Sequence, residues 1–304
     1  MKILITGGAG FIGSHLVEHF QETSDVVVLD NLRSGFEKNI AGMRATLVRA
    51  SVADASAVMK AAEGAEFIFH LAALVSVPES MEKPRETVEI NVQGTLNVLE
   101  AARKHRVKKV VISSSAAVYG DNPTVPKVET MLPEPKSPYA ITKLDSEYYG
   151  NMYTMDFGVP VVCLRYFNVF GPRQNPASQY AAAVPIFIQR ALTNSDLTIY
   201  GDGEQTRDFI YVKDVVRAND LAAKTDRTGV CNIACGGRMT INDLTRTIIE
   251  LTRSSSKVTH GEERAGDVKH SQADIRRAQE IGFQPRYTLE EGLKATVAYF
   301  SSLR

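Results

Sequence analysis

Short apolar runs alternate with longer stretches of helical character over the first 170 residues. The apolar runs predict strands over Lys2–Thr6, Asp25–Leu29, Thr46–Val48, Phe67–Leu71, Val110–Ser113 and Val161–Arg165. The segments between them predict helices over Ser14–Gln21, Ala55–Ala62, Pro84–His105 and Ser137–Phe157. Regular alternation of strand and helix indicates an α/β fold with a doubly wound parallel sheet, which binds ligands at the carboxyl ends of its strands.

The pattern changes after about Gly171, where prolines interrupt it and short helices and strands follow. We therefore expect residues 1–170 to form the sheet domain and residues 171–304 to form mainly a smaller lobe that caps the cleft. Phe209–Val212 and the helix after Asp214, within residues 205–225, are expected to return to the first domain.

Three glycines follow the first predicted strand at the spacing of a dinucleotide-binding turn. Gly7 permits the tight turn, Gly10 lets backbone N–H groups approach a pyrophosphate, and Gly13 lets the next helix pack close to the strand. The N-terminus of that helix favours an anion. Asp30 ends the second strand, 17 residues after Gly13, where it can accept hydrogen bonds from the adenosine ribose. A merely structural turn does not explain this acid, which would repel a 2′-phosphate, so the pattern favours NAD over NADP.

A second motif spans residues 137–143 and begins a long predicted helix. Ser137 suits the N-cap and Pro138 the first helical position, which puts Tyr139 and Lys143 on one face of the helix. A free tyrosine has a pKa near 10, and lowering it to about 7.5 requires roughly 3.4 kcal/mol. An ammonium about 4 Å away supplies on the order of 4 kcal/mol at an effective dielectric near 20, and a cationic cofactor ring would add to that. The pair can therefore make a tyrosinate base if it lines a cleft; otherwise it is an aromatic and a lysine on a surface helix.

Composition excludes several partners. The chain has 304 residues with 35 basic and 35 acidic side chains, so it carries no global signature of nucleic-acid binding. The glycine cluster begins too early for a signal peptide, and no apolar run approaches the length of a membrane span. Three cysteines, without a CxxC pair, indicate reduced structural thiols in a cytoplasmic protein.

One motif points to a metal. His15, Glu18 and His19 match the HxxEH pattern of certain zinc peptidases. They lie directly behind the phosphate turn, and no further carboxylate ligand is evident. We therefore expect no metal and place these side chains against solvent or a neighbouring element.

Further motifs follow in order along nearly the whole chain: Thr6–Gly13, His70–Ala73, Asn91–Thr95, Ser113–Gly120, Tyr139 with Lys143, and Arg165–Gln174. With them the chain resembles the extended short-chain dehydrogenase/reductase family, and within it the NAD-dependent nucleotide-sugar 4-epimerases of UDP-N-acetylglucosamine and UDP-glucose. The resemblance implies a Rossmann domain, bound NAD, a UDP-sugar substrate and a homodimer formed through the helices at 84–105 and 137–157.

The resemblance also assigns roles to matching positions. Ser115, Tyr139 and Lys143 would be catalytic, with Tyr139 as the base and Ser115 on the sugar 4-hydroxyl. The cofactor-binding residues would be Gly7, Gly10, Phe11, Ile12, Gly13, Asp30, Asn31, Ser34, Gly35, Ser51, Val52, Leu71, Ala72, Ala73, Asn91, Ser113, Tyr139, Lys143 and Phe167. Ser51-Val52 departs from the Asp-Ile or Asp-Val pair that often holds the adenine, which leaves that hydrogen bond open.

The segment before Val118 separates related chemistries. Related dehydratases and decarboxylases place a Glu just before Val-Tyr-Gly, preceded by Asp in the dehydratases, to move protons. Here these positions are Ala117 and Ala116. With Ser115, Tyr139 and Lys143 intact, this pattern favours epimerisation.

The substrate-binding residues that the resemblance implies are Ser115, Tyr139, Asn168, Val184, Tyr200, Arg207, Arg264, Asp267 and Ser271. Asn168, Arg207 and Arg264 would hold the diphosphate, which calls for guanidinium forks and an amide donor. Asp267 would accept from the uridine ribose. The small Ser271 matches relatives that accept 2-acetamido sugars. Three alternatives stay open: an epimerase restricted to UDP-glucose and UDP-galactose, a non-catalytic NAD-binding regulator, and a net dehydrogenase that exchanges free NAD.

Overall fold

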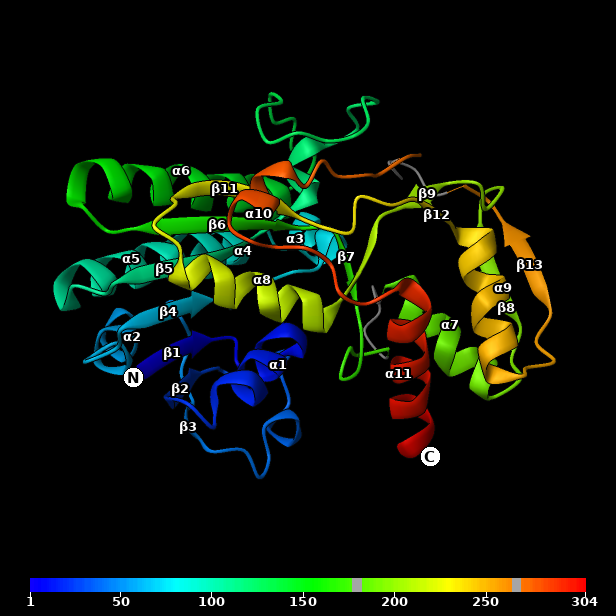
Figure 1. Ribbon diagram of the computed structural model, residues 1–304, viewed down its shortest axis with the longest axis horizontal. Helices are drawn as coiled ribbons and strands as arrows, with labels where there is room; N and C mark the ends of the chain where they lie inside the picture. Colours follow the sequence, from blue (N-terminus) through cyan, green and yellow to red (C-terminus); the bar gives the residue numbers. More distant parts are fainter. Residues whose placement is uncertain (177–181, 264–268) are drawn as a thin grey trace.

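The protein is described here by a computed structural model, which defines residues 1–176, 182–263 and 269–304. A seven-stranded parallel sheet forms its centre (Figure 1). The strands are β1 (Lys2–Thr6), β2 (Asp25–Leu29), β3 (Ala45–Val48), β4 (Phe67–His70), β5 (Lys109–Ser115), β6 (Val161–Tyr166) and β11 (Gly229–Ile233). Their spatial order is β11-β6-β5-β4-β1-β2-β3. The strand order reverses between β1 and β4, and this confirms the predicted doubly wound sheet.

Helices cover both faces of the sheet. One face carries α1 (Phe11–Phe20) and α8 (Val212–Lys224), and the other carries α2 (Ala55–Ala61), α5 (Gly94–His105) and α6 (Pro138–Phe157). Ile3 and Ile5 of β1 belong to the first core and Leu4 to the second, because successive side chains of a strand point to opposite faces. Burial on both faces explains why these strands appear as continuous apolar runs in the sequence.

The helix predicted over 84–105 is interrupted. The segment contains α4 (Pro84–Val88), a π-helical turn (Glu89–Gln93) and α5, and the short α3 (Val77–Glu82) precedes it. Asn91 lies in the π-helical turn and is buried. Such single π turns within helices often occur at functional sites.

A smaller lobe packs around its own apolar core. It contains α7 (Ala183–Leu192), α9 (Ile241–Thr252) and α11 (Leu289–Ser302), with three short strand pairs. The pairs join β7 (Asn168–Phe170) to β10 (Phe209–Tyr211), β8 (Leu197–Tyr200) to β13 (Val258–Gly261), and β9 (Thr206–Arg207) to β12 (Met239–Thr240). In Figure 1 this lobe, with α7, α9 and α11, stands beside the sheet domain.

The chain crosses between the two parts more than once after residue 171. Helix α8, within the segment expected to return, packs on α1, β5 and β6. Strand β11 then extends the sheet beside β6, and α10 (Arg276–Glu280) packs on β11. Neither β11 nor α10 is among the elements that the sequence predicts. Across the described ranges, the helices are too short or too polar for membrane crossing.

Candidate active site

A cleft of about 450 Å³ opens at the carboxyl ends of the sheet strands. It is lined by Ser115 and by every predicted cofactor residue except Asn91: Gly7, Gly10, Phe11, Ile12, Gly13, Asp30, Asn31, Ser34, Gly35, Ser51, Val52, Leu71, Ala72, Ala73, Ser113, Tyr139, Lys143 and Phe167. The structure thus brings together residues from seven separate stretches of the sequence in one hollow. This size is typical of a pocket for a small organic ligand.

The glycine turn packs so closely on the neighbouring backbone that a side chain at Gly7 or Gly13 would collide with it. Gly7 has φ +72°, and a Cβ there would lie 2.7 Å from the Ala72 nitrogen. A Cβ on Gly13 would lie 2.2 Å from the Gly7 oxygen. Helix α1 begins at Phe11 with Gly10 at its N-cap and no side-chain cap. The first N–H groups of α1 are therefore available to an anion, which fits a pyrophosphate.

Asp30 lies beside this turn at the end of β2 and is buried. Its Oδ2 accepts a hydrogen bond from Ala9 N at 3.0 Å, and its Oδ1 accepts one from Leu32 N at 2.8 Å. These bonds fix the carboxylate at the wall of the cleft, and each oxygen keeps a lone pair for a ribose hydroxyl. The glycine cradle and this acid together fit a dinucleotide such as NAD.

Tyr139 and Lys143 both line the cleft from the first turns of α6. The helix begins as predicted: Ser137 Oγ accepts from Ala140 N at 3.2 Å, and Pro138 occupies the first helical position. Lys143 Nζ lies 5.9 Å from the centre of the Tyr139 ring and donates to the Ser113 carbonyl at 2.7 Å. The pair therefore lines a cleft, which is the condition that the predicted tyrosinate base requires.

The pKa values correct one expectation. Burial raises the pKa of Tyr139, and a hydrogen bond with the Ser115 side chain only opposes that rise. Burial also lowers the pKa of Lys143 to about 8. The expected lowering of the pKa of Tyr139 by the lysine is therefore not found in the chain without its cofactor. Burial disfavours the phenolate, while the Lys143 ammonium donates its hydrogen bonds to Ser113.

Ser115 ends β5 on the wall of the cleft. Its Oγ accepts from Ala117 N at 3.2 Å, and a short 3₁₀ turn over Ala116–Tyr119 follows. The two methyl groups that follow Ser115 can neither give nor take a proton. Ser115 at the end of β5 and Tyr139 at the start of α6 thus each present a hydroxyl group to a substrate in the cleft.

Asn91 lies behind the wall of the cleft. Its Oδ1 accepts from Leu74 N at 2.7 Å, while its Nδ2 donates to Leu74 O at 3.1 Å and to Thr142 Oγ1 at 2.9 Å. These bonds join the segment after β4 to α6. The expected contact of Asn91 with the nicotinamide ribose stays a prediction.

A buried ion pair supports Lys143 and is absent from the predicted site. Glu147, one turn along α6, accepts from Arg165 Nε at 2.8 Å and Nη2 at 2.6 Å, and from Ser114 Oγ at 2.5 Å. The charge of Glu147 raises the pKa of Lys143 and so partly offsets its burial. The sequence could have indicated both residues. Glu147 follows Lys143 by four residues and so shares its helix face, and Arg165 begins the motif Arg165–Gln174.

Apart from Ser115 and Tyr139, the predicted substrate residues that the structure describes lie on several segments of the smaller lobe. Asn168 Nδ2 donates to the Asp208 carbonyl at 3.1 Å, Arg207 lies in β9, and Ser271 N donates to Thr206 O at 3.0 Å. Val184 is buried in the core of the lobe, and Tyr200 is exposed at the end of β8. Arg264 and Asp267 lie outside the described residues. Gln174, Asn175 and Tyr166, which were not predicted, also line the cleft.

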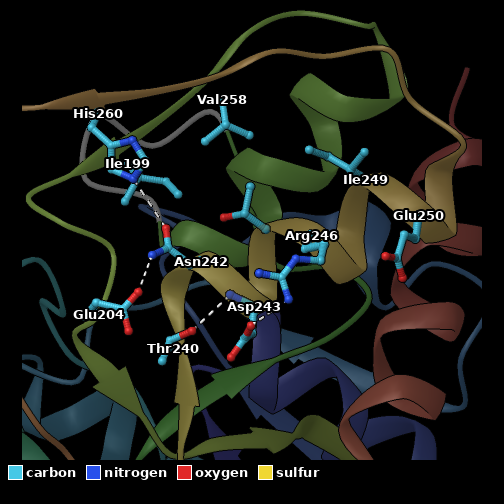
Figure 2. A pocket seen from close by; sticks show the side chains of 11 residues that line it. Ile199, Glu204, Thr240, Asn242, Asp243, Arg246, Ile249, Glu250, Val258 and His260 are labelled. Carbon is cyan, nitrogen blue, oxygen red and sulfur yellow. Dashed lines mark hydrogen bonds and ion pairs between the residues drawn. The ribbon is translucent and has the colours of Figure 1, made fainter.

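A second cavity, of about 540 Å³, lies in the smaller lobe between α9, β8 and β13. Its polar side chains are paired with one another (Figure 2): Asn242 donates to Glu204 at 2.6 Å, His260 contacts Asn242 at 3.3 Å, and Arg246 donates to Asp243 at 2.9 Å. Two of these bonds meet at Asn242, and the third joins two residues of α9. The cleft with Tyr139 is therefore the candidate active site.

The side chains of the HxxEH motif make other contacts. His15 Nε2 donates to Pro172 O at 2.9 Å, and its Nδ1 accepts from Arg173 at 2.6 Å. Glu18 pairs with Arg173, and His19 contacts Asp220 at 3.7 Å. The motif thus connects α1 to the segment after β7 and to α8.

Comparison with known proteins identifies the family. The model of the NAD dependent epimerase/dehydratase family matches residues 3–234. A UDP-glucose 4-epimerase of Mycolicibacterium smegmatis is 38% identical over 312 residues, which cover 99% of this chain and 98% of that protein.

Two solved structures share the whole fold. The UDP-N-acetylglucosamine 4-epimerase from Methanobrevibacter ruminantium, in complex with UDP-N-acetylmuramic acid, is 42% identical with a TM-score of 0.97, covering 100% of this chain and 99% of its own. The Thermus thermophilus UDP-glucose 4-epimerase in complex with NAD is 35% identical with a TM-score of 0.92, covering 100% of both chains. The chain therefore belongs to the NAD-dependent epimerase/dehydratase family, its cofactor is NAD, and it is an isomerase like the epimerases that it matches.

Proposed function

We propose that this chain is a UDP-hexose 4-epimerase that interconverts UDP-N-acetylglucosamine with UDP-N-acetylgalactosamine, and UDP-glucose with UDP-galactose. One observation carries the proposal: Ser115, Tyr139 and Lys143 line a single cleft with the glycine turn, and alanines follow Ser115. Elimination or decarboxylation would need a further acid or base at those alanines. Inversion of one alcohol centre needs only Ser115, Tyr139 and Lys143 together with the cofactor.

In the proposed reaction, Tyr139 takes the proton of the sugar 4-hydroxyl while Ser115 hydrogen-bonds its oxygen. NAD, held by the glycine turn, Asp30 and Lys143, supplies the acceptor and donor of a hydride at carbon 4. Arg207, Asn168 and Arg264 hold the diphosphate while the 4-keto sugar turns over about its phosphate linkage. Tyr139 then returns the proton to the opposite alcohol. No net oxidation occurs, so the NAD should stay bound.

The acetylated sugars are proposed because Ser271 is small. Its segment lies against Thr206, next to the proposed diphosphate anchor Arg207. The Methanobrevibacter structure, named for UDP-N-acetylglucosamine, supports this reading, and the Mycolicibacterium relative, named for UDP-glucose, supports activity on plain sugars. An epimerase restricted to plain sugars is the alternative.

We also propose a homodimer. Helix α6 exposes Ile141, Tyr148, Met152 and Met155, and α4 exposes Val88. The four α6 residues follow one another at helical spacing and form a stripe along one face. A second copy of this chain would cover that stripe.

All three cysteines are free thiols, which supports the expected cytoplasmic location.

Product analysis tests the function. Purified protein is incubated with UDP-N-acetylglucosamine and, separately, with UDP-glucose, without added NAD, and the nucleotide sugars are separated by chromatography. We expect the 4-epimer of each. Turnover of UDP-glucose alone would favour the restricted epimerase, and no turnover would favour a regulator. A parallel incubation with added NAD tests for a net dehydrogenase, because free NAD must accept the hydride of each turnover; growing absorbance at the NADH band there would contradict the proposal.

A further inference from the structure

Asp208 is a buried carboxylate that backbone N–H groups satisfy. It lies between β9 and β10 and is 1% exposed. Its Oδ1 accepts from Cys235 N at 2.9 Å, and its Oδ2 accepts from Gly236 N at 3.0 Å and from Ala273 N at 3.1 Å. Two segments, one after β11 and one before α10, therefore converge on this side chain.

The same segments carry the proposed substrate anchors. Arg207 directly precedes Asp208, and Asn168 donates to the Asp208 carbonyl. Ser271 lies two residues before Ala273 and donates its N–H to Thr206 O at 3.0 Å. The diphosphate anchors thus adjoin the backbone of Asp208, and the residue proposed to face the sugar lies two residues from Ala273, whose N–H the Asp208 carboxylate accepts.

We infer that Asp208 is a positioning residue that holds Arg207, Asn168 and Ser271 in register for the UDP part of the substrate; the inference rests on the proposed function. A carboxylate offers acceptors on both oxygens. An amide has one acceptor oxygen, so an Asn at this position turns an NH₂ group toward one of the backbone N–H groups. The converging segments must then separate, and the anchors move with them.

The chain offers a matched control in Asp214, which is 0% exposed. Its Oδ1 accepts from Arg286 N at 2.9 Å and its Oδ2 from Tyr287 N at 3.1 Å. It is thus also a buried carboxylate that accepts from backbone N–H groups, with a further contact from Arg217 Nη1 at 3.3 Å, but it joins α8 to the segment before α11. Replacing Asp214 by Asn tests what a lost buried carboxylate does without moving the anchors.

The experiment compares wild type, Asp208→Asn and Asp214→Asn as purified with their NAD. Calorimetric titration with UDP gives Kd, released NAD gives cofactor content, and epimerisation gives KM and kcat. We expect Asp208→Asn to raise Kd for UDP and KM by about tenfold or more, since each lost hydrogen bond to a charged group matters at that scale. Its NAD content and its kcat at saturating substrate should stay near wild type, and Asp214→Asn should leave Kd and KM unchanged.

Unchanged UDP binding by folded Asp208→Asn, or an equal rise in Asp214→Asn, would overturn the inference. If Asp208→Asn does not fold, Asp208→Glu decides: it keeps two acceptor oxygens but displaces the segments, so it should raise Kd for UDP above the values of wild type and Asp214→Asn, and an unchanged Kd would overturn the inference. A wild type that binds UDP without turning over any UDP-sugar would contradict the proposed function alone. A wild type that does not bind UDP would contradict both.

Discussion

Lys143 lies with its Nζ 5.9 Å from the centre of the Tyr139 ring and donates its hydrogen bonds to the carbonyl and hydroxyl oxygens of Ser113. Both ionisable groups are shifted away from the charged form, because burial raises the pKa of Tyr139 and lowers that of Lys143. The protein alone therefore holds a neutral phenol. The cationic nicotinamide ring of bound NAD would add a positive charge that favours the phenolate.

Removing NAD should therefore change the titration of Tyr139. We expect the pKa of Tyr139 to lie above 10 in the NAD-free protein and to fall when NAD binds, because the cationic ring favours the phenolate. The measurement is tyrosinate absorbance against pH, with Tyr139→Phe subtracted to isolate this residue. Tyr148→Phe, on the exposed face of the same helix, serves as the control. Equal pKa values with and without NAD would contradict the expectation.

Lys143 should cost the NAD-free protein stability at neutral pH. Its pKa in the folded chain, about 8, lies below the ordinary 10.5. Below pH 8 the folded and the unfolded chain both carry the ammonium, and the folded chain is destabilised because that charge is buried. At about 1.36 kcal/mol per pH unit this amounts to roughly 3 kcal/mol. Between pH 8 and 10.5 the folded chain releases the proton that the unfolded chain keeps, so wild-type stability rises with pH.

The variant Lys143→Met lacks this titration. We expect it to be more stable than wild type at pH 7, inactive, and to lose its advantage as the pH rises from 8 to 10.5. Denaturant unfolding at several pH values measures the difference. Lys294→Met, at an exposed site on α11, should show no such trend. A stability difference that is constant with pH would show that Lys143 does not titrate in this way.

These findings separate what the sequence could predict from what it could not. The start of α6 was predictable because Ser137 and Pro138 act within one turn. The direction of the pKa shift of Tyr139 was not predictable, because it depends on burial, and the spacing of residues along a helix does not reveal burial. Asp208 was also hidden, because its partners Cys235 and Ala273 lie 27 and 65 residues away.

Strand β11 escaped prediction for a related reason. It is an edge strand that begins with Gly229 and carries Asn232 as its fourth residue, so it lacks the continuous apolar run that marks the central strands. Asn232 is nevertheless fully buried, because its Nδ2 donates to Lys127 O at 3.0 Å and its Oδ1 accepts from Tyr119 at 2.6 Å. A polar residue that is satisfied by distant partners carries no local signal of burial.

Arg173 should help to retain the cofactor. It has φ +66° and contacts both His15 and Glu18 of α1, and the next residues, Gln174 and Asn175, line the cleft. Burial lowers the pKa of His15, which fits a neutral ring that accepts from Arg173 and donates to Pro172. These contacts fasten a segment that lines the cleft to the helix whose N-terminus is expected to hold the pyrophosphate.

We expect Arg173→Ala to release bound NAD about tenfold faster, since charged hydrogen bonds are lost. Dialysis followed by assay of retained NAD measures this loss. Arg44→Ala, which removes an exposed ion pair with Glu22, should retain NAD like wild type. Equal retention by Arg173→Ala would show that this segment does not hold the cofactor in place.

Ser271 should decide which sugars the enzyme accepts. Its backbone is bonded to Thr206, so a larger side chain at this position cannot withdraw without breaking that bond. We expect Ser271→Tyr to lower kcat/KM for UDP-N-acetylglucosamine by about a hundredfold, since a steric clash of roughly 3 kcal/mol is on the scale of an overpacked site. Turnover of UDP-glucose should change little, because that sugar lacks the N-acetyl group that must pass the side chain. Ser271→Ala is the matched control, and it should keep both activities because it removes no space. Parallel loss of both activities in Ser271→Tyr would mean that the side chain blocks the nucleotide rather than the acetyl group, and would assign the sugar preference to another residue.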